Sequence, residues 1–299
     1  MPVCEEKEIF NADRVELVRL KQHTLRQKVS AEGVGLFSGQ TVSITLCPAP
    51  EGHGIVFKRT DLPHSLSFSA SSESVQGTPR CTIIGNGTDS VQTVEHLLAA
   101  LRAYDVDNVL IEITGGEVPI FDGSSKVFVE MIESAGVLPQ VEQKTVLRLK
   151  EPLFWSQGGI HIVALPSDEY RVSYTLHYPH CPVIGTQFYT FPVTPSSFKK
   201  EIASCRTFSI YEEIAPMIEK GLVRGGSLDR SILIKEGRVA NPEGLRYEDE
   251  MVRHKILDLI GDLALLPPFL AHVIAICSGH TSNSAFAKQF LKYVKVENL

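Results

Sequence analysis

The sequence has no excess of positive charge, no paired cysteines and no long apolar run, and each absence excludes a class of protein. Its net charge is −6, so we expect no nucleic-acid partner, and any phosphate contact must be local. None of the six cysteines forms a Cys-x-x-Cys pair, which argues against a disulfide framework and suits a reducing cytoplasm. The most apolar run, 263–277, is interrupted by Pro267 and Pro268, so no transmembrane segment is expected. Residues 1–20 are acidic and lack the apolar core of a secretory signal. We expect a soluble, cytoplasmic protein.

What the sequence does contain is a pattern of strands and helices that occurs twice. Residues 1–21 are expected to form an N-terminal extension, either a short amphipathic helix or a loose arm. Strand-like runs and two helices then predict a first α/β domain at 22–140. After a polar link the pattern restarts at 145–299, which predicts a second α/β domain with a proline-rich insert around 179–195. Two similar α/β halves would place an active site in the cleft between them.

The run 253–262 predicts a helix that places His254, Asp258 and Asp262 on one stripe, because four residues advance a helix by about 400°. An imidazole and a carboxylate one turn apart can share a metal ion. The alternative is a core helix with a satisfied histidine and a paired aspartate, and this run alone favours that alternative.

A second run predicts a buried helix, with Thr93 as its N-cap and Glu95 in the first turn. A buried glutamate beside the buried His96 needs a reason, because unpaired buried charge is costly. Together with His254 and Asp258, His96 completes a known catalytic zinc set that leaves a position for water. Iron(II) is an alternative metal for the same ligands. Glu95 points about 100° away from His96 around the helix, where a general base must stand.

His280 lies between a predicted strand at 271–277 and a predicted helix at 284–293. As an imidazolium, it is suited to stabilise an oxyanion or to protonate a leaving amine. The charge requires an anionic partner, for which Asp262 is the candidate. The alternative is an ordinary loop histidine.

These runs resemble the zinc-dependent UDP-3-O-acyl-N-acetylglucosamine deacetylase family of lipid A biosynthesis in Gram-negative bacteria. The resemblance extends from about Gln22 to near the C-terminus. It is carried by the runs 93–101, 120–124, 205–208, 225–227, 248–262 and 278–280. The resemblance implies an α+β fold of two similar halves, each a β-sheet layer packed on helices, which form a sandwich around the active site.

The resemblance also implies roles for individual residues. It implies that His96, His254 and Asp258 bind Zn²⁺ and that Glu95 is the general base. It further implies that His280, oriented by Asp262, stabilises the oxyanion or protonates the leaving amine.

The resemblance places Thr207 near the scissile carbonyl and Phe208 against the sugar or nucleotide. Lys255 is expected to meet phosphate or sugar oxygens, with a solvated surface lysine as the alternative. Phe37 replaces a histidine that is usual in the family, so we expect a more apolar passage for the acyl chain. The insert at 179–195 is the expected wall of that passage.

The expected substrate is UDP-3-O-acyl-N-acetylglucosamine, bound by a monomer and cleaved to UDP-3-O-acyl-glucosamine and acetate. One rival function is that of a zinc peptidase, but its His-Glu-x-x-His motif is absent. Another is a non-catalytic nucleotide-sugar or lipid-binding protein with a structural metal. Structural zinc sites usually have four protein ligands, so an open position on the metal would favour the enzyme.

Overall fold

The computed structural model describes residues 10–63, 67–87 and 89–295. Within these ranges the chain forms helices and several sheets without a closed barrel, which confirms the predicted α+β class. The α-helices are α1 (Glu95–Ala103), α2 (Lys126–Ala135), α3 (Pro195–Glu201), α4 (Tyr211–Glu219), α5 (Glu250–Leu263) and α6 (His280–Val294), and a 3-10 turn η1 covers Ser72–Ser74. None of the described helices has both the length and the apolar character needed to cross a membrane.

Two five-stranded sheets have the same strand order and the same strand directions, which confirms the expected two similar halves. The first sheet has the order β2 (Val29–Val34), β3 (Thr41–Pro48), β9 (Val109–Ile113), β4 (Ile55–Arg59), β5 (Ser67–Ser69). The second has the order β11 (Leu153–Gln157), β12 (Ile160–Leu165), β19 (His272–Ile276), β13 (Arg171–Tyr178), β14 (Gly185–Pro192). Each sheet contains one parallel pair, β4 with β9 and β13 with β19, and its other pairs are antiparallel.

The segment predicted as an N-terminal extension is mostly part of the sheet structure. Residues 15–21 belong to β1 (Val15–Leu25), which pairs antiparallel with β10 (Val137–Leu149), with Val15 opposite Leu149. The expected helix or loose arm is therefore wrong for these residues, because backbone pairing with a strand more than a hundred residues away overrides their weak helical periodicity. β10 also runs through the polar link predicted at 140–144 and pairs with β18 (Phe269–Leu270). Residues 1–9 lie outside the described part of the chain.

The insert predicted at 179–195 is largely the edge strand of the second sheet. β14 pairs along its whole length with β13, in the position that β5 takes in the first sheet. Pro179 and Pro182 lie in the turn before β14, and Pro192 is its last residue. Proline cannot donate to a strand ladder, so the prolines that suggested an insert mark the ends of an edge strand.

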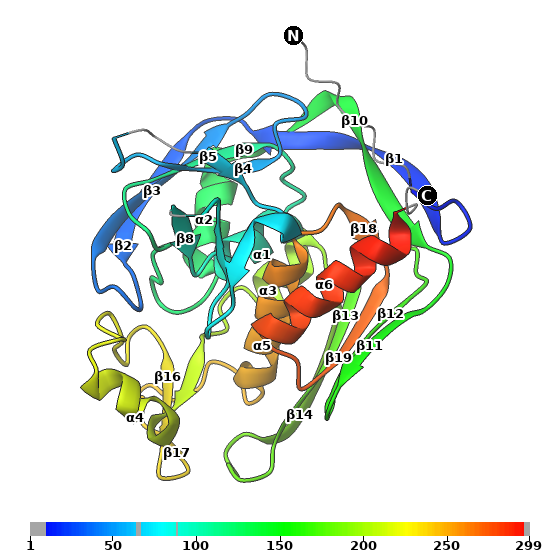
Figure 1. Cartoon of the computed structure of the whole chain (residues 1–299). Helices are drawn as coiled ribbons and strands as arrows, with labels where there is room; N and C mark the ends of the chain where they lie inside the picture. Colours follow the sequence, from blue (N-terminus) through cyan, green and yellow to red (C-terminus); the bar gives the residue numbers. More distant parts are fainter. Residues whose placement is uncertain (1–9, 64–66, 88, 296–299) are drawn as a thin grey trace.

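Two further three-stranded sheets stand beside the cleft described below. One contains β6 (Val75–Gly77), β7 (Ile83–Gly85) and β8 (Ser90–Gln92). The other contains β15 (Phe208–Ile210), β16 (Ile232–Lys235) and β17 (Arg238–Val239), with α4 packed on it. This second group lies below and to the left of the main body in Figure 1.

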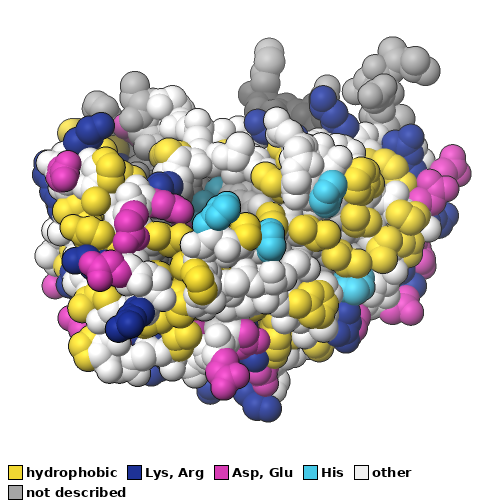
Figure 2. All heavy atoms as spheres, turned by 90° about the horizontal axis from the view of Figure 1, so that it is seen from below, with side chains coloured by type: hydrophobic (Ala, Val, Ile, Leu, Met, Phe, Trp, Pro, Cys, Tyr) yellow, Lys and Arg dark blue, Asp and Glu magenta, His cyan; other side chains and the backbone are white. Residues whose placement is uncertain are grey.

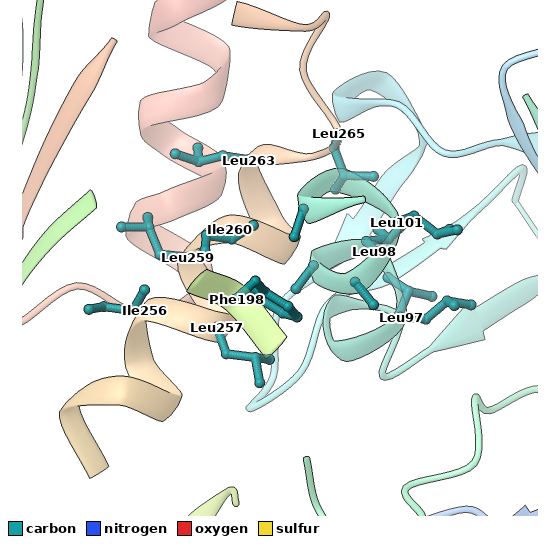
Figure 3. Packing of buried hydrophobic residues seen from close by; sticks show 14 of the residues in the cluster. Leu97, Leu98, Leu101, Phe198, Ile256, Leu257, Leu259, Ile260, Leu263 and Leu265 are labelled. Atoms are coloured by element: carbon teal, nitrogen blue, oxygen red, sulfur yellow. The ribbon is translucent and has the colours of Figure 1, made fainter. Parts of the chain in front are cut away.

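Helices α1, α2 and α5 lie between the two five-stranded sheets. α2 packs on β2 and α5 packs on β13, while α1 and α5 lie against each other at the centre (Figure 1). Figure 3 shows Leu97, Leu98 and Leu101 of α1 and the apolar side chains of α5 in one buried cluster, with Phe198 of α3 among them. These side chains are fully buried, and each contributes about 1.5–3 kcal/mol through burial.

Gly261 explains how α1 and α5 come so close. A Cβ atom at this position would lie 2.1 Å from the carbonyl oxygen of Glu95. Any side chain would therefore force the two helices apart. The helix pair that carries the predicted site residues thus depends on a glycine in the last turn of α5.

Candidate active site

Three predicted metal ligands meet at the interface of α1 and α5. His96 is the second residue of α1, while His254 and Asp258 are one turn apart on α5. Oδ1 of Asp258 lies 3.6 Å from Nε2 of His96 and 3.3 Å from Nε2 of His254. The two imidazole rings are perpendicular, with centroids 5.0 Å apart. All three side chains are buried, and their ligand atoms lie within 4.8 Å of one another.

The hydrogen bonds of His254 show that this group is suited to hold a cation. Its Nδ1 lies 3.1 Å from the carbonyl oxygen of Cys205 and can donate to it. Nε2 then carries the lone pair, and it has no hydrogen-bond partner among the described residues. Burial lowers the pKa of His254 to about 4, so the ring is neutral at pH 7. A buried, neutral imidazole acceptor that faces a carboxylate and a second imidazole matches the donor set of an open zinc site.

Lys255 contacts the same carboxylate. Its Nζ donates to Oδ2 of Asp258 at 2.8 Å, and its side chain is only 16% exposed. The alternative of a solvated surface lysine is therefore wrong. Burial alone would raise the pKa of Asp258, but His254 and Lys255 hold it well below its usual range. The carboxylate is therefore ionised, with Oδ1 facing the imidazoles and Oδ2 bound by the lysine.

Glu95 is the first residue of α1 and is buried beside this group. Its Oε2 accepts a hydrogen bond from the backbone N–H of Thr82 at 3.1 Å, while its Oε1 lies 3.9 Å from Nε2 of His280. Burial raises the pKa of Glu95, and the nearby His280 and His96 offset part of that rise. The raised pKa brings this carboxylate nearer to the range in which a general base works at neutral pH.

The cap predicted for α1 is wrong. The N-cap residue is Val94, and Thr93 has the left-handed backbone φ of 60°. Its hydroxyl instead points to Glu117, with Oγ1 3.4 Å from Oε1. A threonine in this conformation is uncommon, and the turn it makes directs Glu95 and His96 into the site.

His280 begins α6, a few residues earlier than the predicted start of this helix. Its Nδ1 lies 2.8 Å from Oδ2 of Asp262, as predicted for an orienting carboxylate. Burial alone would lower the pKa of His280, but Asp262 and Glu95 raise it to about 9. The imidazole therefore carries a positive charge at neutral pH, with Nε2 directed toward Glu95.

These groups line a cleft of about 380 Å³. Phe37, Thr207, Phe208 and Lys255, which sequence analysis assigned to the substrate, all lie in its wall. The Phe208 ring also packs edge-on against Tyr178, with centroids 6.1 Å apart. The structure thus brings the site residues predicted from the sequence to one cleft, except Asp262, which lies behind His280 and contacts it through Nδ1.

A second, more apolar lobe of about 290 Å³ adjoins this cleft and shares Phe37, Thr207 and Phe208 with it. Its far wall contains Ile214, Met217, Ile218, Val223, Leu228 and Leu233, from α4, the loop after it and β16. The segment 179–195 contributes nothing to this lobe. The expectation that it forms the wall of the acyl passage stays a prediction, since only its first residues, 179–181, line a separate pocket beside the cleft.

Several residues that position the site were not predicted. Thr82 and Asn283 both bind Asp262, through Oγ1 to Oδ1 at 2.5 Å and Nδ2 to Oδ2 at 2.8 Å. The buried Glu117 accepts the backbone N–H groups of Phe37 and Ser38, each at 2.8 Å, and so holds the Phe37 loop against the cleft. Thr82 and Glu117 lie in the connections between elements, where no helical or strand periodicity relates them to the site. Asn283 lies three residues after His280 on α6, a spacing that could have indicated it had the helix been predicted to start at His280.

An open set of two imidazoles and one carboxylate, with a buried glutamate beside it, is the arrangement of a metal-dependent hydrolase. The family model described as LpxC, UDP-3-O-acyl N-acetylglycosamine deacetylase, matches residues 22–292. The chain belongs to this family. It is 44% identical over 275 residues to the UDP-3-O-acyl-N-acetylglucosamine deacetylase of Chlamydia caviae, covering 92% of this chain and 98% of that protein. It is 45% identical to the protein of the same name from Chlamydia abortus, with the same coverage.

Proposed function

We propose that this protein hydrolyses the N-acetyl group of UDP-3-O-acyl-N-acetylglucosamine in lipid A biosynthesis. Water supplies the oxygen that forms acetate, the amide C–N bond breaks, and the 2-amino group of UDP-3-O-acyl-glucosamine receives a proton. One observation carries the proposal: Glu95 and His280 face each other, with Oε1 and Nε2 3.9 Å apart, beside the group of His96, His254 and Asp258. Family membership and the names of the relatives support the substrate.

A zinc ion held by His96, His254 and Asp258 would act as a Lewis acid on the acetyl carbonyl and lower the pKa of water. Iron(II) is the alternative ion for these ligands. Glu95 accepts the proton of the attacking water through Oε1, because Oε2 is already engaged by a backbone N–H.

The charged His280 provides the acid of the reaction. Its Nε2 proton can stabilise the oxyanion of the tetrahedral intermediate and then pass to the leaving amine. Asp262 holds the ring through Nδ1 and stabilises its charge. Thr207 completes the site: it lines the cleft, and its hydroxyl would donate to the developing oxyanion.

The rest of the substrate follows from the chemistry of the cleft. Phe208 offers an aromatic face to the sugar or nucleotide, and Lys255 offers a cation to phosphate or sugar oxygens. Phe37 stands where the polar cleft meets the apolar lobe, so the 3-O-acyl chain enters that lobe past an aromatic ring. The protein acts on this small molecule as a cytoplasmic monomer. On the face seen in Figure 2, basic side chains are scattered among acidic ones, which gives nucleic acid no continuous basic surface there.

A non-catalytic nucleotide-sugar or lipid-binding protein with a structural metal is the second candidate. Among the described residues, the metal group has three protein ligands, whereas structural zinc sites usually have four. Acetate release from UDP-3-O-acyl-N-acetylglucosamine separates the two functions. We expect catalytic release by the purified protein, loss of release after chelation and recovery with added zinc. Substrate binding without any acetate, at full zinc occupancy, would support the binding protein instead.

A further inference from the structure

Thr82 contacts both the proposed base, Glu95, and the carboxylate that orients the proposed acid, Asp262, although it lies on none of the helices that carry these groups. It lies in the turn between β6 and β7 and is almost fully buried. Its backbone N–H donates to Oε2 of Glu95 at 3.1 Å, and its Oγ1 donates to Oδ1 of Asp262 at 2.5 Å. A single residue therefore contacts the base on α1 and the orienting carboxylate on α5.

The contact with Asp262 fixes the orientation of that carboxylate. Oδ2 accepts from Nδ1 of His280 and from Nδ2 of Asn283, both at 2.8 Å, which leaves Oδ1 for Thr82. The hydroxyl has one proton, and the shorter distance assigns it to Asp262 rather than to His280, whose Nδ1 is 3.5 Å away. With donors on both oxygens, the carboxylate cannot rotate without losing a hydrogen bond in a buried site.

The contact with Glu95 selects between its two oxygens. The N–H of Thr82 engages Oε2, so Oε1 is the oxygen left to face Nε2 of His280 at 3.9 Å. The N–H of Thr82 thus fixes the position of Glu95, and its hydroxyl fixes Asp262 and, through it, His280. Together these two contacts set the distance between Glu95 and His280.

We propose that Thr82 is a positioning residue of the deacetylation, whose hydroxyl holds the Asp262–His280 pair in register with the free oxygen of Glu95. This inference rests on the proposed function. Small displacements of a catalytic group reduce the rate strongly, because the bound geometry must be close to that of the reacting one. Losing the hydroxyl should therefore lower kcat and leave substrate affinity nearly unchanged.

Two substitutions separate the hydroxyl from the shape of the side chain. Thr82→Val keeps the β-branched shape and the N–H to Glu95 but removes the hydroxyl. Thr82→Ser keeps the hydroxyl and removes the methyl group. If Thr82 only fills space in the core, the valine variant should be the better of the two. If Thr82 positions Asp262, the serine variant should be the more active of the two.

The experiment compares kcat, KM, zinc content and thermal midpoint for the wild type and both variants. We expect kcat of Thr82→Val to fall about tenfold or more, with KM within about twofold and zinc content unchanged. Thr82→Ser should stay within about threefold of the wild type. A fully active Thr82→Val, or equal losses in both variants that follow a lower thermal midpoint, would overturn the proposal.

A second readout does not depend on turnover. The charged groups that face His280 are Asp262 from α5 and Glu95 from α1, with Asp258 as a further contribution. NMR titration of the His280 ring should show a lower pKa in Thr82→Val than in the wild type and in Thr82→Ser, because a loosened Asp262 stabilises the imidazolium less. Equal pKa values in all three proteins would contradict the positioning role. A wild type that releases no acetate but shows this NMR difference would refute the proposed function and leave the positioning of His280 by Thr82 intact.

Discussion

Helix α5 contributes a carboxylate to each of two imidazole–carboxylate pairs, and the imidazole is neutral in one pair and positively charged in the other. In the first pair, His254 and Asp258 lie on the same helix, and burial lowers the histidine pKa to about 4. In the second, Asp262 faces His280 of α6, and the histidine pKa is raised to about 9. The carboxylates are one turn apart. His254, Asp258 and Asp262 are buried, and the side chain of His280 is 11% exposed.

The difference between the pairs lies in their surroundings. The carboxylate Asp258 is shared with a second imidazole, His96, and with the cation of Lys255, so little of its charge is left to protonate His254. Asp262 faces a single imidazole, and the carboxylate of Glu95 adds a second negative charge near that ring. Helix α5 thus takes part in one pair with a neutral imidazole, His254, and in one with a charged imidazole, His280 of α6, because neighbours rather than residue type set each pKa.

The largest expected effect on kcat comes from removing Glu95, the proposed general base, which lies beside both pairs. Glu95→Ala should lower kcat by about 10²–10⁴, the usual contribution of a general base. Zinc content should not change, because the ligands of the first pair are untouched. Acetate release and metal analysis of the purified variant check both parts, and full activity would refute the assignment of the base.

A smaller effect is expected when the second pair is neutralised. In Asp262→Asn the pKa of His280 should fall, so the alkaline limb of the kcat/KM profile should move from about pH 9 toward the ordinary histidine value of about 6.5. A pH profile measured from pH 5 to about 10 tests this, and an unchanged alkaline limb would show that His280 is not the titrating acid.

The same pair links pH to folding. The folded pKa of His280 is raised above its unfolded value of about 6.5, so its stabilising contribution is fully present below that value. The contribution is lost as pH rises through about 9. Thermal unfolding at pH 6 and at about pH 10 should therefore show a smaller pH dependence for His280→Gln than for the wild type. An identical dependence in both proteins would contradict the raised pKa.

Lys255 contacts Asp258, so substituting it changes the surroundings of the His254–Asp258 pair without removing a proposed metal ligand. Lys255→Met should keep zinc bound but raise KM about tenfold, which corresponds to about 1.4 kcal/mol of lost substrate binding. Lys255→Arg is the matched control that keeps the charge. A normal KM in the methionine variant would mean that the lysine serves only Asp258 and does not meet the substrate.

The smallest effect on kcat is expected from a substitution of Phe37, at the border between the cleft and the apolar lobe. Phe37→His should leave kcat on the preferred substrate within about threefold. It should change the preference among acyl chain lengths, because it makes the entrance to the apolar lobe polar. Comparing kcat/KM for substrates that differ only in chain length measures the change. An unaltered preference would remove Phe37 from the acyl passage.

The parts of this site that lie on helices were predictable, because helical spacing places side chains in space. A spacing of four residues along α5 relates His254, Asp258 and Asp262. Glu95 and His96 are adjacent residues at the start of the buried helix α1. The repetition of the halves was visible in the pattern of strands and helices, and the family resemblance implied the α+β class.

The rest depends on contacts between distant parts of the chain. Thr82 reaches Asp262 across 180 residues of sequence, and Glu117 reaches the Phe37 loop across 80. β1 is a strand only because β10 pairs with it. The segment 179–195 was predicted as an insert and is largely an edge strand, since prolines at the ends of an edge strand have the same sequence pattern as an insert.

The central claim is that the two pairs on α5 divide the work between metal binding and proton transfer. The most direct test measures zinc content and acetate release for His254→Ala and His280→Ala side by side. We predict that His254→Ala loses both zinc and activity, while His280→Ala keeps about one zinc per chain and still loses activity by orders of magnitude. Equal zinc loss in both variants, or full activity in His280→Ala, would contradict the account.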